Sequence, residues 1–457
     1  MQNINLPFPE QRINNSRLLT PKNKKILLTS AAVIILLLTV AFVFARAVNY
    51  KTVAVEDVLF AVDYYPEYNS RGIIKKIFTA SVYFDKVKYL YRPAFMLSFY
   101  IDSRISSGEV NLKVNHASSI ILHAMCLLLF FYFLAKYCFD LWLSFFASLV
   151  FAANVFSVWS AVWLSGRCDL LLFLFSFASF ICFIKANERK SKNFIFWPLH
   201  FIFFFIALLS KETAVILPIV CIAYGFIKQY RKTKAAYFIY LGIYIIYFIG
   251  YRGNIILASL MYQNIFYVTA DYFSAAFMLS KPEIVPIFNI FTLLKGLLVI
   301  IGLFVLALRS KKRKEALFFY FFAIAFLAPT LFSYRLAFQG NRMYVPMAGI
   351  IICTAYILKG FIENGIYSIK RKIVISSILL LFVFSNIIRT VNMMGFAYDD
   401  NSFFSAIINE HRLNYTPKSP TILYINNFFT HSAGHYKLHG HHKEAQNIKD
   451  ILNKYKS

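Results

Sequence analysis

The stretch ILLTSAAVIILLLTVAFVFARAV, Ile26–Val48, is an apolar run that begins directly after a basic segment holding Lys22, Lys24 and Lys25. A helix needs about 20 apolar residues to cross the hydrocarbon core of a bilayer, so this run predicts a first membrane span. The run is longer than the hydrophobic region of a secretory signal peptide and has no clear small-residue cleavage site. We therefore expect a retained span.

Similar apolar runs follow along the chain. They are Ala117–Ala135, Leu141–Val158, Cys168–Lys185, Phe194–Leu209, Thr213–Ile227, Ala235–Gly250, Phe288–Leu308, Ala316–Ser333, Val345–Ile362 and Ile373–Thr390. The chain is 59% hydrophobic and 15% charged, whereas soluble domains are roughly 25% charged. Helices satisfy their own backbone groups in lipid. The sequence therefore predicts an all-α polytopic membrane protein with about eleven spans, and leaves open a further re-entrant or spanning piece within Ile255–Met278.

Basic residues cluster in every second connection between these runs. They are Lys136; Arg189, Lys190 and Lys192; Lys228, Arg231, Lys232 and Lys234; Arg309, Lys311, Lys312, Arg313 and Lys314; and Lys370, Arg371 and Lys372. The positive-inside rule places such connections in the cytoplasm, together with the basic N-terminal segment. The net charge of +27 therefore reflects membrane topology, and we expect no binding of nucleic acid.

The same rule places the other connections and the chain end outside the cytoplasm. It divides the chain into a cytoplasmic segment (1–25), a transmembrane domain (26–390) with a large first outer loop (49–116), and a small extracytoplasmic segment (391–457). The abundance of Lys, Asn, Ile and Phe is typical of an AT-rich bacterial genome, so we expect a bacterial plasma or inner membrane.

The C-terminal segment contains a candidate strand, Thr421–Ile425, and a stretch, Tyr436–Leu452, that resembles a single tetratricopeptide hairpin. One such hairpin does not bury its own core, so it would dock on the membrane domain or on a partner. Histidines also gather here, at His431, His435, His439, His441 and His442. Both a metal site and a solvated helical hairpin fit these histidines.

Two adjacent carboxylates, Glu56 and Asp57, open the first outer loop. Such a pair suits a general base or the ligands of a divalent cation such as Mg²⁺ or Mn²⁺, and it is also common as a solvated pair. The spacing alone does not choose among these roles.

Further unusual residues lie later in this first outer loop and in the other outside loops. They are Arg92, His116, Arg167, Asp169, Lys211, Glu212, Arg342 and Tyr344. An arginine at the membrane surface makes bidentate contacts with phosphate, although Arg, Lys and Tyr also serve there as anchors. His116 and His123 share one helix face, but no third ligand is near them in sequence, which favours packed histidines over metal. Together the charged residues predict one extracytoplasmic pocket suited to a lipid-linked anion.

In their order, these motifs resemble those of the GT-C superfamily of polytopic glycosyltransferases, in particular the O-mannosyltransferase-like membrane region of transmembrane tetratricopeptide proteins and their bacterial relatives. The matching residues are Glu56-Asp57, Tyr91-Arg92-Pro93 with Ser98-Phe99, His116 and His123, Phe151-Ala152, Trp163 with Ser165-Gly166-Arg167, Leu209-Ser210-Lys211-Glu212 with Pro218, and Arg342, Tyr344 and Pro346. Four positions depart from the family pattern: Ser119 replaces an Asn between the two histidines, Asn154 and Val155 replace His-Pro, and Trp159 stands where the family often has Glu.

The resemblance implies a GT-C-like helix bundle and a polyprenyl-phosphate-linked sugar donor. It implies inverting transfer to a hydroxyl of a protein or glycan outside the cytoplasm. Asp57 would be the base, and Glu56 would assist it or bind a metal. The residues on the lipid-phosphate and substrate side would be Arg92, Arg167, Lys211, Glu212, Arg342, Tyr344 and His116.

Other classes of membrane protein remain open. A flippase or transporter of lipid-linked saccharides would show inverted repeats and ionisable groups near the bilayer midplane. An O-antigen polymerase or ligase would carry its large loop late in the chain. In a receptor or scaffold without chemistry, the acidic pair would be dispensable.

Overall fold

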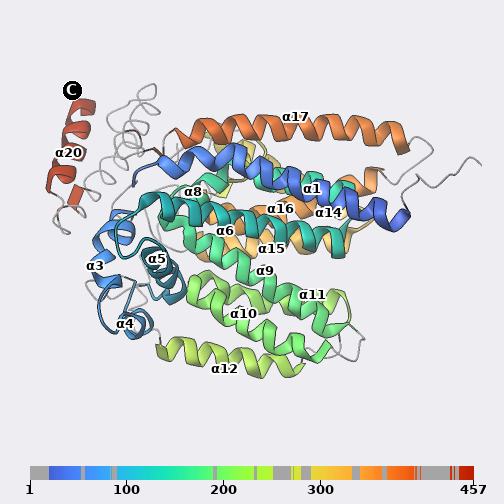
Figure 1. Ribbon diagram of the computed structural model, residues 1–457. Coiled ribbons are helices and arrows are strands. Elements are labelled where there is room, and N and C mark those ends of the chain that lie inside the picture. The colour runs from blue at the N-terminus through green and yellow to red at the C-terminus, as the bar shows by residue number, and fades with distance from the viewer. Residues whose placement is uncertain are drawn as a thin grey trace, which may run out of the picture.

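A computed structural model of the 457-residue chain describes residues 20–52, 57–82, 84, 90–188, 193–230, 234–250, 269–270, 272–278, 290–331, 340–362, 368–395, 397–398, 402, 433–434, 437 and 442–456. Over these ranges the chain forms α-helices and short 3₁₀ or π segments, without a strand. The long helices lie side by side in one bundle (Figure 1).

Each predicted apolar run coincides with one or more helices. The long helices are α1 (Pro21–Phe44), α6 (Leu112–Phe133), α7 (Leu141–Ala152), α9 (Arg167–Asn187), α10 (Phe196–Ser210), α11 (Leu217–Ile227), α12 (Lys234–Gly250), α14 (Ile290–Arg309), α15 (Arg313–Leu331), α16 (Tyr344–Ile362) and α17 (Ser368–Met394). Among the described residues, five helical segments are long and apolar enough to cross a membrane, or up to six if one bent pair is a single span. The polytopic all-α class is therefore confirmed, while the number of about eleven spans stays a prediction.

Shorter elements fill the connections. They are η1 (Ala45–Asn49), η2 (Leu59–Asp63), α3 (Tyr65–Tyr68), α4 (Ile73–Thr79), α5 (Pro93–Ile105), η3 (Leu134–Cys138), η4 (Val155–Ser157), α8 (Val158–Ala161), η5 (Leu164–Gly166), η6 (Asn193–Ile195), η7 (Glu212–Ile216), η9 (Gly340–Met343) and α20 (His442–Lys456). The predicted first outer loop thus carries helices of its own. α6 begins earlier than the predicted span, at Leu112, so the last residues of the predicted loop up to His116 are helical. Asn111 caps this helix, with Oδ1 accepting from the Val114 N–H at 3.3 Å.

Chain turns far apart in sequence meet at one end of the bundle. The contacts there are Lys228 Nζ to Glu315 Oε1 at 2.8 Å, Ser310 Oγ to the Tyr356 carbonyl at 3.3 Å, and Trp142 Nε1 to Ser376 Oγ at 3.0 Å. They join the C-terminal end of α11 to the start of α15, the α14–α15 turn to α16, and the start of α7 to the start of α17. Several of the predicted cytoplasmic basic residues belong to these turns.

The C-terminal end of α17 and the segments that follow α1 and α17 meet at the opposite end of the bundle. The Lys51 N–H donates to the Tyr398 carbonyl at 3.0 Å, and the Arg46 guanidinium donates to the Val391 carbonyl. Figure 1 shows α3, α4, α5 and α20 at this end and the start of α1 at the other. The alternation agrees with that expected from the charges; which end faces the cytoplasm stays a prediction.

The predicted run Leu141–Val158 is interrupted. α7 ends at Ala152, and the following helical stretch Val155–Ala161 is bent from it by 50°. Asn154 stabilises the break, because its Nδ2 donates to the Phe151 carbonyl at 2.6 Å and to Ser157 Oγ at 2.9 Å. The break occurs where the resembled family has His-Pro, and in this chain the side-chain hydrogen bonds of Asn154 accompany it without a proline.

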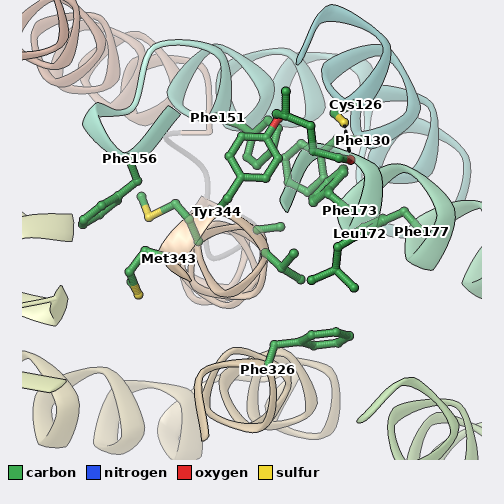
Figure 2. Close-up of a cluster of buried hydrophobic side chains, with 14 of the residues drawn as sticks. Cys126, Phe130, Phe151, Phe156, Leu172, Phe173, Phe177, Phe326, Met343 and Tyr344 are labelled. Carbon is green, nitrogen blue, oxygen red and sulfur yellow. Dashed lines mark hydrogen bonds between the residues drawn. The ribbon is translucent and has the colours of Figure 1, made fainter. Parts of the chain in front are cut away.

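The bundle has a buried centre and an apolar exterior. Most of α9 and α16 is buried, whereas most of α1 and α17 exposes apolar side chains, as expected for helices that face lipid. Aromatic rings fill the centre, where Figure 2 shows Tyr344 beside Phe151 and Phe173. The ring centroids of these two phenylalanines lie 5.2 and 5.4 Å from that of Tyr344.

Several predictions fall outside the described residues. They are the role of Glu56, the strand Thr421–Ile425, and the histidines other than His442 in the C-terminal segment. α20 overlaps the predicted hairpin and buries Ala445 and Ile448. The tetratricopeptide resemblance and the segment boundaries stay predictions.

Candidate active site

Asp57 is fully buried at the end of the bundle where α1 and α17 exit. Its Oδ1 accepts from the backbone N–H and the hydroxyl of Ser165, both at 2.9 Å. Its Oδ2 accepts from the Leu164 N–H at 3.3 Å. These N–H groups begin the helical segment that continues as α9, and an anion is stabilised at such a helix start. The first outer loop is thereby attached to α9.

Two glycines, Gly166 at the end of η5 and Gly340 at the start of η9, let their backbones pack tightly against Trp159. A Cβ on Gly166 would lie 1.9 Å from the Trp159 carbonyl oxygen, and a Cβ on Gly340 would lie 2.2 Å from Trp159 Cδ1. Real Cβ atoms do not approach other atoms so closely, so only glycine, which has no side chain, fits at both positions. The glycine of the motif Ser165-Gly166-Arg167 thus holds η5 on α8.

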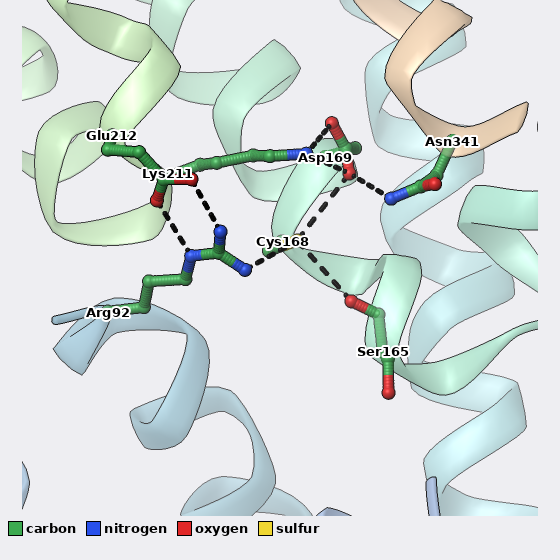
Figure 3. Close-up of polar contacts among 7 residues, drawn as sticks. All are labelled: Arg92, Ser165, Cys168, Asp169, Lys211, Glu212 and Asn341. Atoms are coloured by element: carbon green, nitrogen blue, oxygen red, sulfur yellow. Dashed lines mark hydrogen bonds and ion pairs between the residues drawn. The ribbon is translucent and has the colours of Figure 1, made fainter. Parts of the chain in front are cut away.

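Lys211 and Asp169 form a buried ion pair. Lys211 Nζ lies 2.7 Å from both carboxylate oxygens of Asp169, and Asn341 Nδ2 donates to Oδ2 at 2.7 Å (Figure 3). α9 supplies the aspartate, η9 supplies the asparagine, and the connection between α10 and η7 supplies the lysine. Because both charges are paired and hydrogen-bonded, their burial is tolerated.

Arg92 and Glu212 form a second pair with fork geometry. Arg92 Nε donates to Oε2 at 2.9 Å and Nη2 donates to Oε1 at 2.6 Å. Burial is the largest single influence and acts against the charge on the guanidinium, but the charge and hydrogen bond of Glu212, together with the nearby Cys168 and Asp169, outweigh it and raise the pKa of Arg92. Arg92 Nη1 also lies 3.7 Å from Cys168 Sγ, which sits between the two ion pairs (Figure 3).

The two ion pairs put opposite charges together, so neither pair adds net charge to the site. Lys211 and Arg92, expected to face a lipid phosphate, already contact carboxylates. The side chains nonetheless differ in exposure: Glu212 is 40% exposed, whereas Lys211 and Asp169 are nearly enclosed. A polar ligand therefore has more access to the Arg92–Glu212 pair.

Arg167 lies wholly inside the protein. Its Nη1 is 2.7 Å from Asp102 Oδ2, and the two side chains are 0% and 2% exposed. Nε donates to Ser119 Oγ at 3.0 Å and Nη2 donates to the Asn115 carbonyl at 2.6 Å. The guanidinium also stacks over the Phe99 ring, with Cζ 4.2 Å from its centroid. Arg167 therefore ties α5 and α6 to α9, and we leave it out of the proposed lipid-phosphate contacts.

Tyr344 is also internal. Its hydroxyl lies 2.7 Å from His123 Nδ1, and His123 Nε2 lies 3.1 Å from the Ala152 carbonyl. Since a carbonyl only accepts, Nε2 carries the proton and Nδ1 accepts from the tyrosine. The contact joins α16, α6 and α7, and it leaves the Tyr344 hydroxyl directed at protein.

His116 is 1% exposed, and over the described ranges neither of its ring nitrogens has a hydrogen-bond partner. Its ring meets that of Tyr50 edge-on, with centroids 6.5 Å apart. A buried imidazole without partners loses the hydrogen bonds it makes in water. His116 therefore stays a candidate for contact with a substrate.

Arg342 is partly exposed in η9, which packs against α8 and η4. Glu56 lies outside the described residues. Within the parts of the chain that are described, three or more His, Cys, Asp or Glu side chains are nowhere grouped as a metal site requires. A divalent cation at the acidic pair stays a prediction.

The structure adds functional neighbours that the sequence motifs did not single out. Asn341 completes the Lys211–Asp169 pair, and Asp102 is the partner of Arg167. Neither residue belongs to the motifs quoted above, and sequence proximity favours pairing Arg167 with Asp169 and Lys211 with Glu212. The observed pairs cross between helices, so no local spacing identifies them.

Residues 110–257 match the family described as dolichyl-phosphate-mannose-protein mannosyltransferase. The match begins just before α6 and runs past the end of α12, so it includes His116, Arg167, Asp169, Lys211 and Glu212. It supports the predicted resemblance to glycosyltransferases of the GT-C superfamily. None of the curated proteins compared with the chain matches it.

Proposed function

We propose that this chain, a membrane glycosyltransferase of the GT-C type by its family match, moves a sugar from a polyprenyl-phosphate donor to a hydroxyl of a protein or glycan outside the cytoplasm. One observation carries the proposal. Asp57 and the ion pairs Arg92–Glu212 and Lys211–Asp169 all meet the junction of η5 and α9 at one end of the bundle. The site thus combines a carboxylate with polar and cationic groups beside the membrane.

In the proposed reaction, the carboxylate of Asp57 takes the proton of the acceptor hydroxyl while its oxygen attacks the anomeric carbon of the donor sugar. The bond between that carbon and the phosphate oxygen breaks, and the lipid phosphate leaves with the electron pair. A positioned base contributes about 10²- to 10⁴-fold to such a rate. A single displacement inverts the anomeric configuration. The basic connections support a cytoplasmic N-terminus and a site on the opposite face.

A second assignment of the base is favoured by the enclosure of Asp57. Both of its oxygens accept hydrogen bonds from η5 and the side chain is fully buried. In that assignment Asp57 anchors the loop and the neighbouring Glu56 is the base. Replacing each acid separately distinguishes the two.

Arg342 is the proposed contact of the departing phosphate, supported by its partial exposure next to Asn341. We expect Arg342→Ala to weaken binding of a sugar-carrying and of a sugar-free polyprenyl phosphate alike, by about 10-fold or more, because hydrogen bonds to charged groups are strong. Binding to purified protein in lipid nanodiscs measures both. Unchanged affinity for the sugar-free lipid would remove Arg342 from this role.

The function is tested with purified wild-type protein in right-side-out vesicles, supplied with polyprenyl-phosphate hexoses and membrane acceptors on the outer face. We expect transfer of the sugar, and an inverted anomeric centre in the isolated product. A product of retained configuration contradicts the single displacement. Movement of the intact lipid-linked sugar across the bilayer without transfer supports a transporter instead.

A further inference from the structure

Asn341 carries an amide oxygen with no hydrogen-bond partner within the described part of the chain. The residue is 5% exposed, and its Nδ2 donates to the Asp169 carboxylate at 2.7 Å. Because a carboxylate paired with Lys211 only accepts, the amide nitrogen must face Asp169. The amide oxygen lies on the side away from Asp169 (Figure 3). It is therefore a buried acceptor that lacks a donor.

Trp163 supplies a buried hydrogen-bond donor that likewise has no partner within the described residues. Among the described residues its indole N–H has no acceptor, and the ring is partly exposed. The ring meets Trp159 edge-on, with centroids 5.9 Å apart and planes at 87°. Trp163 also directly precedes Leu164 and Ser165, whose N–H groups hold Asp57. The aromatic ring is thus close in the chain to the proposed base.

Trp159 joins the two groups. The backbone of Gly340 lies directly on its indole, since a Cβ there would come within 2.2 Å of Cδ1. Asn341 follows Gly340, and Trp163 contacts the same indole. We call Trp159, Trp163, Gly340 and Asn341 the tryptophan cluster. Trp159 occupies a position where the resembled family often has Glu, so this cluster is a departure from that pattern.

The chemistry of the cluster selects its ligand. The amide oxygen needs a hydroxyl or amine that donates, and the indole N–H needs an oxygen that accepts. The aromatic face suits apolar C–H groups. An ionised phosphate offers only acceptors and cannot satisfy the amide, whereas a sugar ring offers hydroxyl donors, oxygen acceptors and a C–H face. The neighbouring Lys211 is already paired with Asp169, so no unpaired charge of that pair favours an anion here.

We infer that the tryptophan cluster binds the uncharged sugar ring of the lipid-linked donor. The inference rests on the proposed function for the identity of the donor. In this inference Asn341 and Trp163 recognise the sugar, whereas Arg342 is proposed to contact the phosphate. The cluster thereby determines which donors bind, and the lipid phosphate alone does not use it.

Equilibrium binding tests the inference without requiring turnover. Purified protein in nanodiscs is titrated with a polyprenyl-phosphate hexose and with the same polyprenyl phosphate lacking sugar. Wild type should prefer the sugar-carrying lipid by about 5-fold or more, because a single neutral hydrogen bond contributes about that much to an affinity. Asn341→Leu and the milder Trp163→Phe, which keeps an aromatic ring but removes the indole N–H, should each reduce that preference and leave the affinity for sugar-free lipid unchanged.

The controls are the matched substitutions Asn386→Leu in α17 and Trp197→Phe in α10, which should preserve the preference. Equal affinity of wild type for both lipids, or an undiminished preference in both cluster variants, overturns the inference. A soluble methyl hexoside then identifies the source of the ring. If the hexoside competes in wild type, the cluster binds any sugar ring. If the hexoside does not compete and the variants lose the preference, the cluster binds the sugar ring only when it is attached to the lipid-linked donor. Loss of transfer activity with intact sugar preference would count against the proposed function alone.

Discussion

Asp57→Asn is expected to lower the rate of sugar transfer by about 10²- to 10⁴-fold, because the amide cannot accept the proton of the acceptor hydroxyl. The substitution keeps the shape of the side chain and one acceptor oxygen for the N–H groups of Leu164 and Ser165. The variant should therefore remain folded and retain donor affinity. Initial rates at saturating donor, with donor binding measured in parallel, separate a loss of chemistry from a loss of binding.

Two companion variants make this prediction specific. Glu67→Gln changes a carboxylate of the same outer loop that is 41% exposed and paired with Lys76, and it should leave the rate unchanged. Glu56→Gln should reduce the rate less than Asp57→Asn. The reverse order, with Asp57→Asn active and Glu56→Gln inactive, would move the base to Glu56 and make Asp57 the anchor of the loop.

Arg167→Met is expected to lower the free energy of unfolding by about 3–5 kcal/mol, since it leaves the Asp102 carboxylate buried without its cation. Asp102 is 2% exposed, and its other oxygen accepts from Ser118 at 2.6 Å. One neutral donor does not replace the guanidinium. Thermal unfolding of purified protein in detergent should show a large shift to lower temperature, together with a lower yield of folded protein.

The exposed pair in the same loop provides the comparison. The side chains of Lys76 and Glu67 are 40% and 41% exposed. Lys76→Met breaks their contact and should change the free energy of unfolding by about 1 kcal/mol or less. The double variant Arg167→Met with Asp102→Leu removes both charges and should recover much of the lost stability. If Arg167→Met unfolds at the temperature of wild type, the buried ion pair does not hold the outer loop to α9.

The two predictions concern different parts of one arrangement. Asp57 accepts hydrogen bonds from Ser165, and Arg167, two residues further along the chain, pairs with Asp102, so both contacts attach the first outer loop to the start of α9. Asp57 makes this attachment at the proposed site of chemistry. Arg167 makes it within the core, out of reach of solvent. A loss of activity in Arg167→Met should therefore follow the loss of folded protein, whereas the loss in Asp57→Asn should not.

The helices of this protein were predictable from composition along the chain. Each apolar run coincides with helical structure, because lipid leaves the backbone no other way to satisfy its polar groups in a span. The ends of the helices were less predictable where a side chain forms hydrogen bonds with the backbone or interrupts its hydrogen bonding. The side chain of Asn154 donates to the Phe151 carbonyl at the point where one predicted run is divided. Pro218 stands in the first turn of α11, and the separate segment η7 precedes that helix.

The candidate site was predictable as a set of residues on one face but not as a set of contacts. Alternation of basic connections brought Arg92, Lys211 and Glu212 to the same end of the bundle, as the structure has them. Arg167 and Tyr344 belonged to the same expected set, yet they lie inside the protein, on Asp102 and His123. Sequence position reports which end of a helix a residue occupies, but not whether its side chain points to solvent or to another helix.

The sequence alone was sufficient for the helical membrane class, the alternation of the connections and the resemblance to GT-C enzymes. These properties depend on hydropathy and charge summed over many residues, and single contacts do not alter them. Only the tertiary structure decided the partners of the charges. Lys211 and Glu212 are neighbours in the chain, but they bind Asp169 and Arg92. A buried charge takes the oppositely charged group that packing brings within about 3 Å, and helices distant in sequence supply that group.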